Sequence, residues 1–268
     1  MAFSMTLRCN GISGLLTSSV CRFSPYNNSQ NKCKFSVTEN VSKTVPKNIK
    51  GKSKGSQEWL RRQLNDPYVK KAQSENYRCR SAYKLLEIDK RFNILKPGNT
   101  VIDCGAAPGS WCQVAVEKIN KNSDLSSVNA GTVIGVDLQH FVDIEGVHVI
   151  GGADFTEKDT QSKIMEILNG KKADVILSDM APKASGIKSM DHELIIELCV
   201  KVLKFGIEVL KPAGTILCKI WMGYNQKQLE DAMKHLFESV QVVKPLSSRT
   251  DSAEIFLLAQ NFKKLKLK

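Results

Sequence analysis

The sequence lacks any long apolar run, although 42% of its 268 residues are hydrophobic. None of its apolar stretches approaches the roughly 18 consecutive residues that a transmembrane helix needs. We therefore expect no insertion into a membrane. The apolar residues are available for the core of one ordinary domain with tails, or of two small domains.

The sequence also lacks the cysteine patterns that hold metals. Its eight cysteines include no C-x-x-C pair, and no cluster of His and Cys has the spacing of a zinc site. Several cysteines lie within apolar strand or helix patterns, where cysteine acts as a small hydrophobic residue. We expect no metal centre, and we expect a reducing compartment.

Acidic residues are absent from the first 38 positions, and the first one is Glu39. This segment carries four Lys and Arg residues and is rich in Ser, Thr and Asn. Such a composition is typical of an organelle transit peptide, and the compact apolar core of a secretory signal is missing. We interpret residues 1–42 as a disordered transit peptide, and the alternative is an ordinary disordered tail.

Positive charge is in excess, with 39 Lys and Arg against 27 Asp and Glu and a formal net charge of +12. Between Lys43 and Lys96, fifteen Lys and Arg face only five Asp and Glu, a net charge of +10. This bias disfavours a dispersed solvated surface and suits an anionic partner, with nucleic acid first and a membrane surface second. Residues 43–55 are interpreted as a basic linker and residues 263–268 as a basic tail.

From Ser56 onwards the sequence alternates between helix and strand patterns. After a helical region with a break at Asp66-Pro67, we expect strands at 100–106, 132–138, 147–154, 173–181 and 214–221 and helices at 111–120, 159–169, 190–210 and 225–237. The last two strands, at 239–245 and 254–262, have no helix between them. This order predicts an α/β fold with a doubly wound, mostly parallel sheet, helices on both faces and an antiparallel last strand.

Charged residues lie near the carboxyl ends of several predicted strands, which is where sheets of this kind bind ligands. Asp103, Asp137, Asp154 and Asp179 occupy four of these ends, and Lys219 lies in the apolar strand TILCKIW. Each acid alone could be a helix cap or a turn former, but four in succession indicate a site. A buried lysine needs partners, so Lys219 either points to water from an edge strand or opens onto this site.

The stretch VIDCGAAPGSW, residues 101–111, has the pattern of a strand, a Gly/Pro-rich turn and a helix. Its glycines permit positive φ and a close approach of the backbone to a ligand. The turn is not G-x-G-x-x-G, which disfavours a NAD-dependent dehydrogenase. Asp137, after IGV, is in the place of an acid that binds ribose hydroxyls, and Asp154 is placed to meet an adenine edge.

Five motifs together are similar to those of the FtsJ family of S-adenosylmethionine-dependent RNA ribose 2′-O-methyltransferases: RSAYKL, DCGAAPGSW, SDMAPKASG, CKIW and SSRTDSAEIFLLA. The resemblance covers residues 56–262, and within the family it points to the members that methylate a uridine of mitochondrial large-subunit rRNA. It implies a Rossmann-like methyltransferase sheet with S-adenosyl-L-methionine as the cofactor and large-subunit rRNA as the partner. The acid-free leader favours the mitochondrial matrix as the location, and we expect a monomer that supports ribosome assembly.

The resemblance assigns roles to individual residues. It implies a catalytic tetrad of Lys84, Asp179, Lys219 and Glu254. It implies cofactor contacts at Pro108, Gly109, Ser110, Trp111, Asp137, Asp154 and Asp179. Ser110 departs from the family, where many members have glycine, and its side chain is expected to face the cofactor or solvent. The polar stretch 120–129 is a second departure and is expected to be a lengthened loop.

The family's chemistry needs no metal, because the methyl group on a sulfonium is already electrophilic. Lys219 would act as general base in its neutral form, which burial and a neighbouring ammonium from Lys84 favour. Asp179 and Glu254 would orient the two lysines. Two other functions stay open: a ribose methyltransferase of tRNA or of an mRNA cap, and an RNA-binding ribosome assembly factor.

Overall fold

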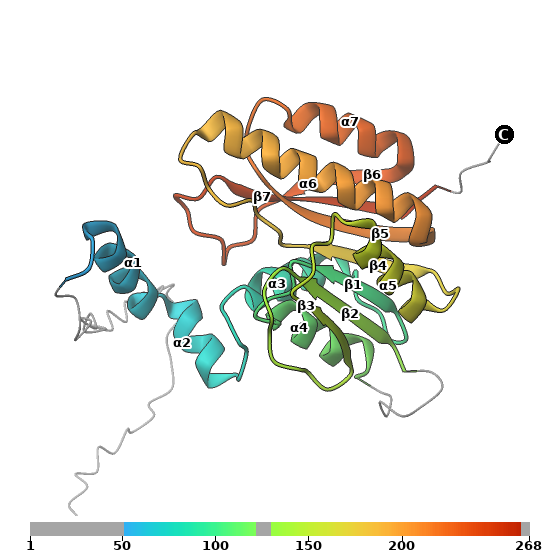
Figure 1. The fold of residues 1–268 in the computed structure, drawn as a ribbon, viewed down its shortest axis with the longest axis horizontal. Helices are drawn as coiled ribbons and strands as arrows, with labels where there is room; N and C mark the ends of the chain where they lie inside the picture. Colours follow the sequence, from blue (N-terminus) through green and yellow to red (C-terminus); the bar gives the residue numbers. More distant parts are fainter. Residues whose placement is uncertain (1–50, 122–129, 264–268) are drawn as a thin grey trace, which may run out of the picture. The chain divides into compact units, whose positions relative to one another are not determined.

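A computed structural model describes residues 51–121 and 130–263 of this chain. The expected transit peptide, residues 43–50 of the linker, most of the polar stretch 120–129 and most of the tail lie outside the described residues. The described residues form a seven-stranded sheet in the order β3-β2-β1-β4-β5-β7-β6, with helices on both faces (Figure 1). None of the helices within 51–121 and 130–263 is long and apolar enough to cross a membrane.

Five parallel strands make up the first part of the sheet. They are β1 (Thr100–Cys104), β2 (Thr132–Asp137), β3 (Val147–Gly151), β4 (Ala173–Ser178) and β5 (Leu210–Trp221). β1 pairs with β2 and β4, β2 also pairs with β3, and β4 also pairs with β5. Because β2 and β4 lie on opposite sides of β1, the strand order reverses at β1. Open α/β sheets bind their ligands at such a reversal, beyond the carboxyl ends of the strands.

The last strand is antiparallel, which confirms the prediction from the sequence. β7 (Glu254–Phe262) lies inside the sheet, between β5 and β6 (Phe237–Val243), and is antiparallel to both. Its register places Phe256 opposite Lys219, and Glu254 opposite Trp221. Since side chains alternate along a strand, Glu254 and Lys219 project from the same face of the sheet.

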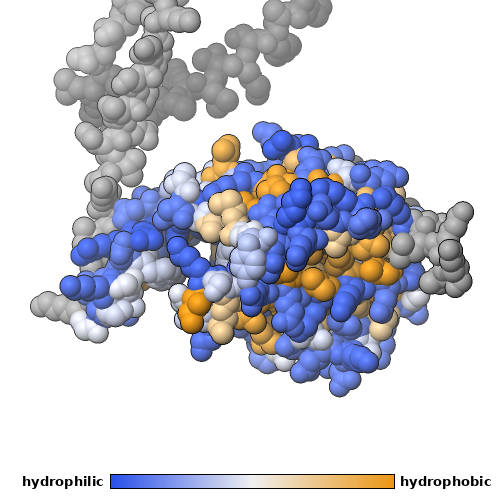
Figure 2. Space-filling model, turned by 90° about the horizontal axis from the view of Figure 1, so that it is seen from above, coloured by the Kyte–Doolittle hydropathy of each residue, from blue (hydrophilic) through white to orange (hydrophobic). Residues whose placement is uncertain are grey.

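Local capping explains where the first helices begin and end. The helices are α1 (Lys54–Asn65), α2 (Pro67–Ser74), α3 (Ala82–Phe92), α4 (Ser110–Ile119), α5 (Lys158–Leu168), α6 (Lys188–Val209) and α7 (Gln226–Leu236). α1 begins two residues before the predicted Ser56, because the Ser53 side chain accepts a hydrogen bond from the Ser56 N–H. Asp66 caps α2 and Pro67 is its first residue, which accounts for the predicted break. The surface over α1 and α2 is mostly hydrophilic (Figure 2).

Two apolar cores lie on the two faces of the sheet. The first contains buried residues of α3 and α4, and the second contains buried residues of α5, α6 and α7. In β1, Val101 belongs to the first core, whereas Ile102 and Cys104 belong to the second. The same alternation in β5 assigns Leu217 to the first core and Cys218 to the second. Asp103 and Lys219 therefore project from the face that α3 and α4 cover.

Gly206 of α6 packs directly against β5, so a substitution at this position tests the packing of the second core. A Cβ atom at Gly206 would lie 2.7 Å from Ile216 Cδ1, closer than real Cβ contacts. We predict that Gly206→Ala lowers the free energy of unfolding by about 1 kcal/mol, because overpacking outweighs the gain in helix propensity. In an Ile216→Val background, which lacks Cδ1, the same substitution should be stabilising.

Urea unfolding of the four proteins in this double-mutant cycle measures the coupling between the two positions. If Gly206→Ala had the same effect in both backgrounds, α6 would not approach β5 as closely as described.

Candidate active site

Four charged side chains from four parts of the chain meet on the α3 and α4 face, at the carboxyl end of the parallel strands. Lys219 Nζ lies 2.9 Å from Asp179 Oδ1, just after β4. Lys84 Nζ, on α3, lies 2.7 Å from Glu254 Oε2 and 4.0 Å from Asp179 Oδ1. Because β7 runs in the opposite direction, its first residue, Glu254, lies at this edge. The structure thus brings together the four residues of the tetrad that the resemblance implies.

Two serine hydroxyls fix the carboxylates of the tetrad. Ser81 Oγ donates a hydrogen bond to Asp179 Oδ2 at 2.7 Å, and Ser248 Oγ donates to Glu254 Oε1 at 2.9 Å. Trp111 Nε1 donates to the carbonyl oxygen of Ser81 at 2.8 Å and so holds this residue in place. Neither serine is predicted from the sequence, although both lie within motifs that carry the resemblance, RSAYKL and SSRTDSAE.

Lys219 is buried, with 9% of its surface exposed, and its strand lies between β4 and β7. The alternative of an edge-strand lysine that points to water is therefore excluded. Its ammonium donates to the backbone carbonyl of Asp179 and also faces the Asp179 carboxylate. The Asp179 carbonyl takes one of the three N–H donors of this ammonium, whereas the contact with Asp179 Oδ1 is an ion pair without hydrogen-bond geometry. This leaves N–H donors of Lys219 for a ligand in the site.

Asp179 is held in its ionised form. Burial alone would raise the pKa of this carboxyl, but the positive charges of Lys219 and Lys84 outweigh burial and keep the pKa below its ordinary value. The hydrogen bond from Ser81 acts in the same direction. Asp179 is therefore an anion that anchors two cations.

A further acid, Asp103 of β1, is fully buried on the same face. Cys112 Sγ donates to Asp103 Oδ2 at 3.1 Å, whereas no residue within the described ranges bonds to Oδ1. Burial raises the pKa of Asp103 to about 7; the Cys112 thiol opposes this shift, and the charges of Asp179 and Asp137 add to it. Near neutral pH this carboxyl is therefore partly protonated.

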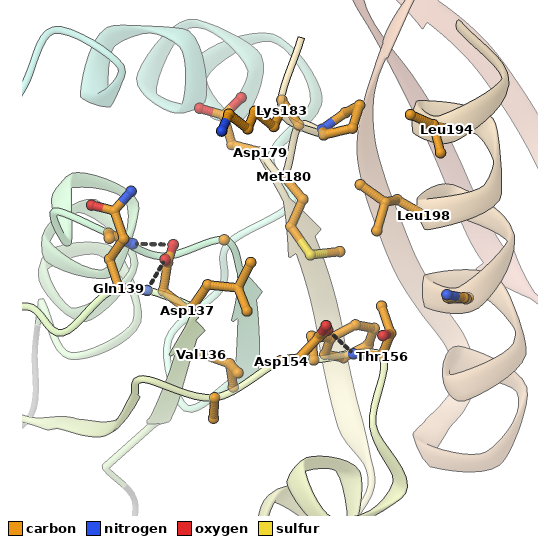
Figure 3. Close-up of a pocket in the computed structure, with 18 of the residues that line it drawn as sticks. Val136, Asp137, Gln139, Asp154, Thr156, Asp179, Met180, Lys183, Leu194 and Leu198 are labelled. Atoms are coloured by element: carbon orange, nitrogen blue, oxygen red, sulfur yellow. Dashed lines mark hydrogen bonds between the residues drawn. The ribbon is translucent and has the colours of Figure 1, made fainter. Parts of the chain in front are cut away.

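A cavity of about 420 Å³ lies where the strand order reverses, at the carboxyl ends of β1 to β4 (Figure 3). Its volume is in the range of small-molecule binding sites. Three of the predicted cofactor residues line it, namely Asp137, Asp154 and Asp179. Apolar side chains complete the wall, with Met180 after β4 and with Leu194 and Leu198 from α6 (Figure 3).

Backbone N–H groups fix the two carboxylates at the ends of β2 and β3. Asp137 Oδ2 accepts a hydrogen bond from Ala107 N at 2.9 Å, and Oδ1 accepts from Gln139 N at 2.7 Å. Asp154 Oδ1 accepts from Thr156 N at 2.7 Å. A carboxylate oxygen can accept more than one hydrogen bond, so both side chains can also bind the donors of a ligand. Two fixed acids in a partly apolar cavity fit the hydroxyl and amino groups of a nucleoside.

The turn after β1 depends on Gly105. This residue has a φ of +83°, and a Cβ atom on it would lie 2.7 Å from Met180 Cγ and 2.9 Å from Met180 N. Only glycine allows the turn to run this close to the segment after β4. The approach keeps Met180 and the turn on the same wall of the cavity. Met180 is not predicted from the sequence, although it lies in the motif SDMAP.

The other four predicted cofactor residues do not line this cavity. Pro108 and Gly109 belong to the turn before α4, and Arg78 Nη1 donates to the Pro108 carbonyl at 2.9 Å. Ser110 is buried, with its Oγ 3.0 Å from Cys79 Sγ, so this side chain does not face solvent, and its expected contact with the cofactor stays a prediction. Trp111 is buried as well, and its indole packs against Phe256 with ring centroids 5.7 Å apart.

The buried acid predicts a pH dependence of stability. Folded Asp103 keeps its proton up to about pH 7, whereas an unfolded aspartate releases it near pH 4, so the folded state binds more protons between these values. The contribution of Asp103 to the free energy of unfolding is therefore fully present below pH 4 and is lost as the pH rises through 7. Asp103→Asn is uncharged throughout, so it should gain stability relative to wild type by on the order of a few kcal/mol between pH 4 and 8.

Urea unfolding of both proteins across this pH range measures the difference. Parallel pH profiles for wild type and Asp103→Asn would show that Asp103 is already ionised in the folded protein at low pH.

Comparison with known proteins identifies the fold family. The model of the FtsJ-like methyltransferase family matches residues 77–262. A Drosophila melanogaster protein named mitochondrial rRNA methyltransferase 2 is 50% identical over 222 residues, which are 83% of this chain and 89% of that protein. A Cereibacter sphaeroides protein named ribosomal RNA large subunit methyltransferase E is 46% identical over 217 residues, 81% of this chain and 88% of that one.

Among solved structures, a Plasmodium falciparum protein described as a ribosomal RNA methyltransferase superposes with a TM-score of 0.62. It is 33% identical, and the match covers 70% of this chain and all of that one. The region that the family model matches, residues 77–262, contains every strand of the sheet and all four residues of the tetrad. This chain belongs to the FtsJ-like methyltransferase family.

Proposed function

We propose that this protein methylates the 2′-hydroxyl of a ribose, that of a uridine, in the large-subunit rRNA of mitochondria and thereby supports ribosome assembly. The observation that carries the proposal is the assembled tetrad beside a cavity that fits a nucleoside. The names of the Drosophila and Cereibacter relatives support rRNA as the substrate class and the large subunit as its source.

The proposed methyl donor is S-adenosyl-L-methionine. In this proposal Asp137 holds the ribose hydroxyls of the cofactor and Asp154 faces the adenine edge, with apolar contacts from Met180 and Leu198. When bound, the cofactor supplies a methyl group that is electrophilic because it is attached to a positively charged sulfur. Asp179 lines the same cavity and belongs to the tetrad, so the donor and the catalytic groups share one wall.

The residues of the tetrad act on the substrate hydroxyl. The Lys219 ammonium of the resting site must first release one proton to solvent, and the resulting neutral amine carries a lone pair, which accepts the proton of the 2′-hydroxyl at Nζ. The adjacent Asp179 carboxylate fixes the amine and compensates the charge that it gains. The Lys84 ammonium, held by Glu254, is positioned to stabilise negative charge on the oxygen that has lost its proton.

The basic helices α1 and α2 are proposed to bind RNA phosphates. Arg61, Arg62, Lys70 and Lys71 belong to these helices and are all exposed. Their pairing with acids is limited: Arg62 contacts Glu58 on the same helix and lies 4.0 Å from Asp251, and Lys71 lies 3.8 Å from Glu75. Exposed ion pairs of this kind contribute little, so the cations stay available for phosphate.

The proposed location is the mitochondrial matrix, and the proposed working form is a monomer. The acid-free basic leader and the mitochondrial name of the Drosophila relative support the location. The tetrad and the cavity are both built from residues of one chain, which supports a monomer.

We predict that Lys219→Ala and Lys219→Met lower the single-turnover rate of methyl transfer to rRNA at least about 100-fold, because the general base is lost. Binding of S-adenosylhomocysteine, measured by calorimetry, should stay close to wild type, because Lys219 does not line the cofactor cavity. Lys211→Ala is the matched control: it removes an exposed lysine from the same strand and should leave the rate unchanged.

Near-normal transfer by both Lys219 variants would refute the assignment of this residue. If both variants failed to fold, as judged by circular dichroism, Lys219 would be structural.

We predict that changing Arg61, Arg62, Lys70 and Lys71 together to Gln flattens the salt dependence of RNA binding. Each lost phosphate contact should reduce the slope of log K against log salt by about 0.7 to 0.9. The affinity for an rRNA transcript, measured at several salt concentrations from about 50 to about 300 mM, gives this slope. A slope equal to that of a control with Lys227 and Lys234 of α7 changed to Gln would place the RNA contacts elsewhere.

A further inference from the structure

A second cavity, of about 300 Å³, adjoins the tetrad. Lys84 and Glu254 line it, whereas the first cavity is lined by Asp179, and the two cavities share no lining residue. Lys84 Nζ lies only 4.0 Å from Asp179 Oδ1. The tetrad therefore separates two spaces, and a ribose at the tetrad can extend the rest of its nucleotide into the second one.

The charges of the second cavity suit a nucleotide. Arg80, Lys84 and Arg249 line it together with a single carboxylate, that of Glu254. Arg80 is already engaged by the Asp66 carboxylate and by the carbonyl of Ser247. Arg249 is freer: its side chain is 34% exposed, and its nearest carboxylate oxygen, on Asp66, lies 3.5 Å away. A guanidinium in this state is available to a phosphate.

The remaining wall comes from α1, and it carries an exposed aromatic ring. Trp59 lines the cavity although 56% of its surface is exposed. α1 has no buried residue at all, so packing of this protein's own core does not explain a tryptophan here. Single-stranded RNA is recognised by bases that stack on aromatic side chains in this way.

Gln63 lies one helical turn after Trp59 and lines the same cavity. Within residues 51–121 and 130–263 its side-chain amide has no hydrogen-bond partner. An amide offers both donors and an acceptor, which is what the edge of a pyrimidine or purine base needs. Stacking and edge recognition can therefore come from successive turns of one helix.

We propose that the second cavity binds the base of the nucleotide that is methylated, with Trp59 stacked on the base, Gln63 at its edge and Arg249 at its phosphate. This inference rests on the proposed function and adds to it the subsite that holds the target nucleotide. A protein partner for α1 is the competing explanation, but it does not account for a cavity that opens onto Lys84 and Glu254.

The test compares Trp59→Ala and Trp59→Phe with wild type in two assays. The first is the quenching of tryptophan fluorescence by a nine-residue oligouridylate, about the length that one single-strand binding site covers. The second is methyl transfer to mitochondrial large ribosomal subunits and to their protein-free rRNA, both from cells that lack the protein. Leu64→Ala is the control, because Leu64 is exposed on the same helix but does not line the cavity.

Trp59→Ala should raise the KM for protein-free rRNA about tenfold, the effect of losing one stacked base. Trp59→Phe keeps an aromatic ring, so its KM for protein-free rRNA should stay close to the wild-type value. Leu64→Ala should match wild type. The quenching seen with wild type should be lost in both Trp59 variants. Affinity for S-adenosylhomocysteine should be unchanged in all of them, since Trp59 does not line the cofactor cavity.

Two outcomes overturn the inference. A KM for Trp59→Ala within about twofold of wild type, with quenching retained, would mean that no base stacks there. A defect on intact subunits but not on protein-free rRNA would mean that α1 contacts a ribosomal protein. If wild type itself transferred no methyl group to either RNA, the proposed function would fail, and the quenching by oligouridylate would still test base binding by Trp59.

Discussion

The ion pairs of Asp179 with Lys219 and Lys84 connect parts of the chain that are far apart in the sequence. Side chains of all four tetrad residues are 10% to 18% exposed, so each charge has lost most of its water. Removing one partner from such a set leaves an uncompensated buried charge, which is strongly unfavourable. With two ammoniums and two carboxylates the set is neutral, and this neutrality makes a lysine acceptable in the middle of a sheet.

The neutrality of the tetrad depends on how the sheet is built. β7 enters between β5 and β6 and runs against both, which brings its first residue, Glu254, to the edge where the parallel strands end. A parallel strand in that place would have brought Phe262 to this edge instead. Asp103 shows the opposite case on the same face: no cation within the described parts of the chain pairs with this buried acid, and burial raises its pKa to about 7. Partners therefore decide which acids of this face are ionised.

Much of the fold and the site follows from local sequence patterns. The strand TVIDC and the apolar run around Lys219 are recognisable because buried parallel strands are nearly continuous apolar segments. The motifs also name the tetrad, because each member lies in a short distinctive segment. The place of β7 inside the sheet is not predictable in this way, since strand pairing is a long-range property that either edge could satisfy.

Other features also depend on contacts between distant residues. β5 begins at Leu210 rather than at the predicted Gly214, because Leu210 pairs with Ala173 across a register shift that the apolar pattern does not reveal. The inward turn of Ser110 depends on Cys79, 31 residues earlier, and the roles of Ser81 and Ser248 depend on the carboxylates that they reach. In each case the side chain's direction is set by a partner, and the sequence around it does not specify that partner.

The most direct test of the central claim is a map of 2′-O-methyl groups on mitochondrial large-subunit rRNA. Mass spectrometry would compare cells that lack this protein with the same cells after the wild-type protein is restored. We expect one 2′-O-methylated uridine to be lost in the first and regained in the second, with all other modifications unchanged. An identical set of 2′-O-methyl groups in both would contradict the account, whatever the RNA affinity of the protein.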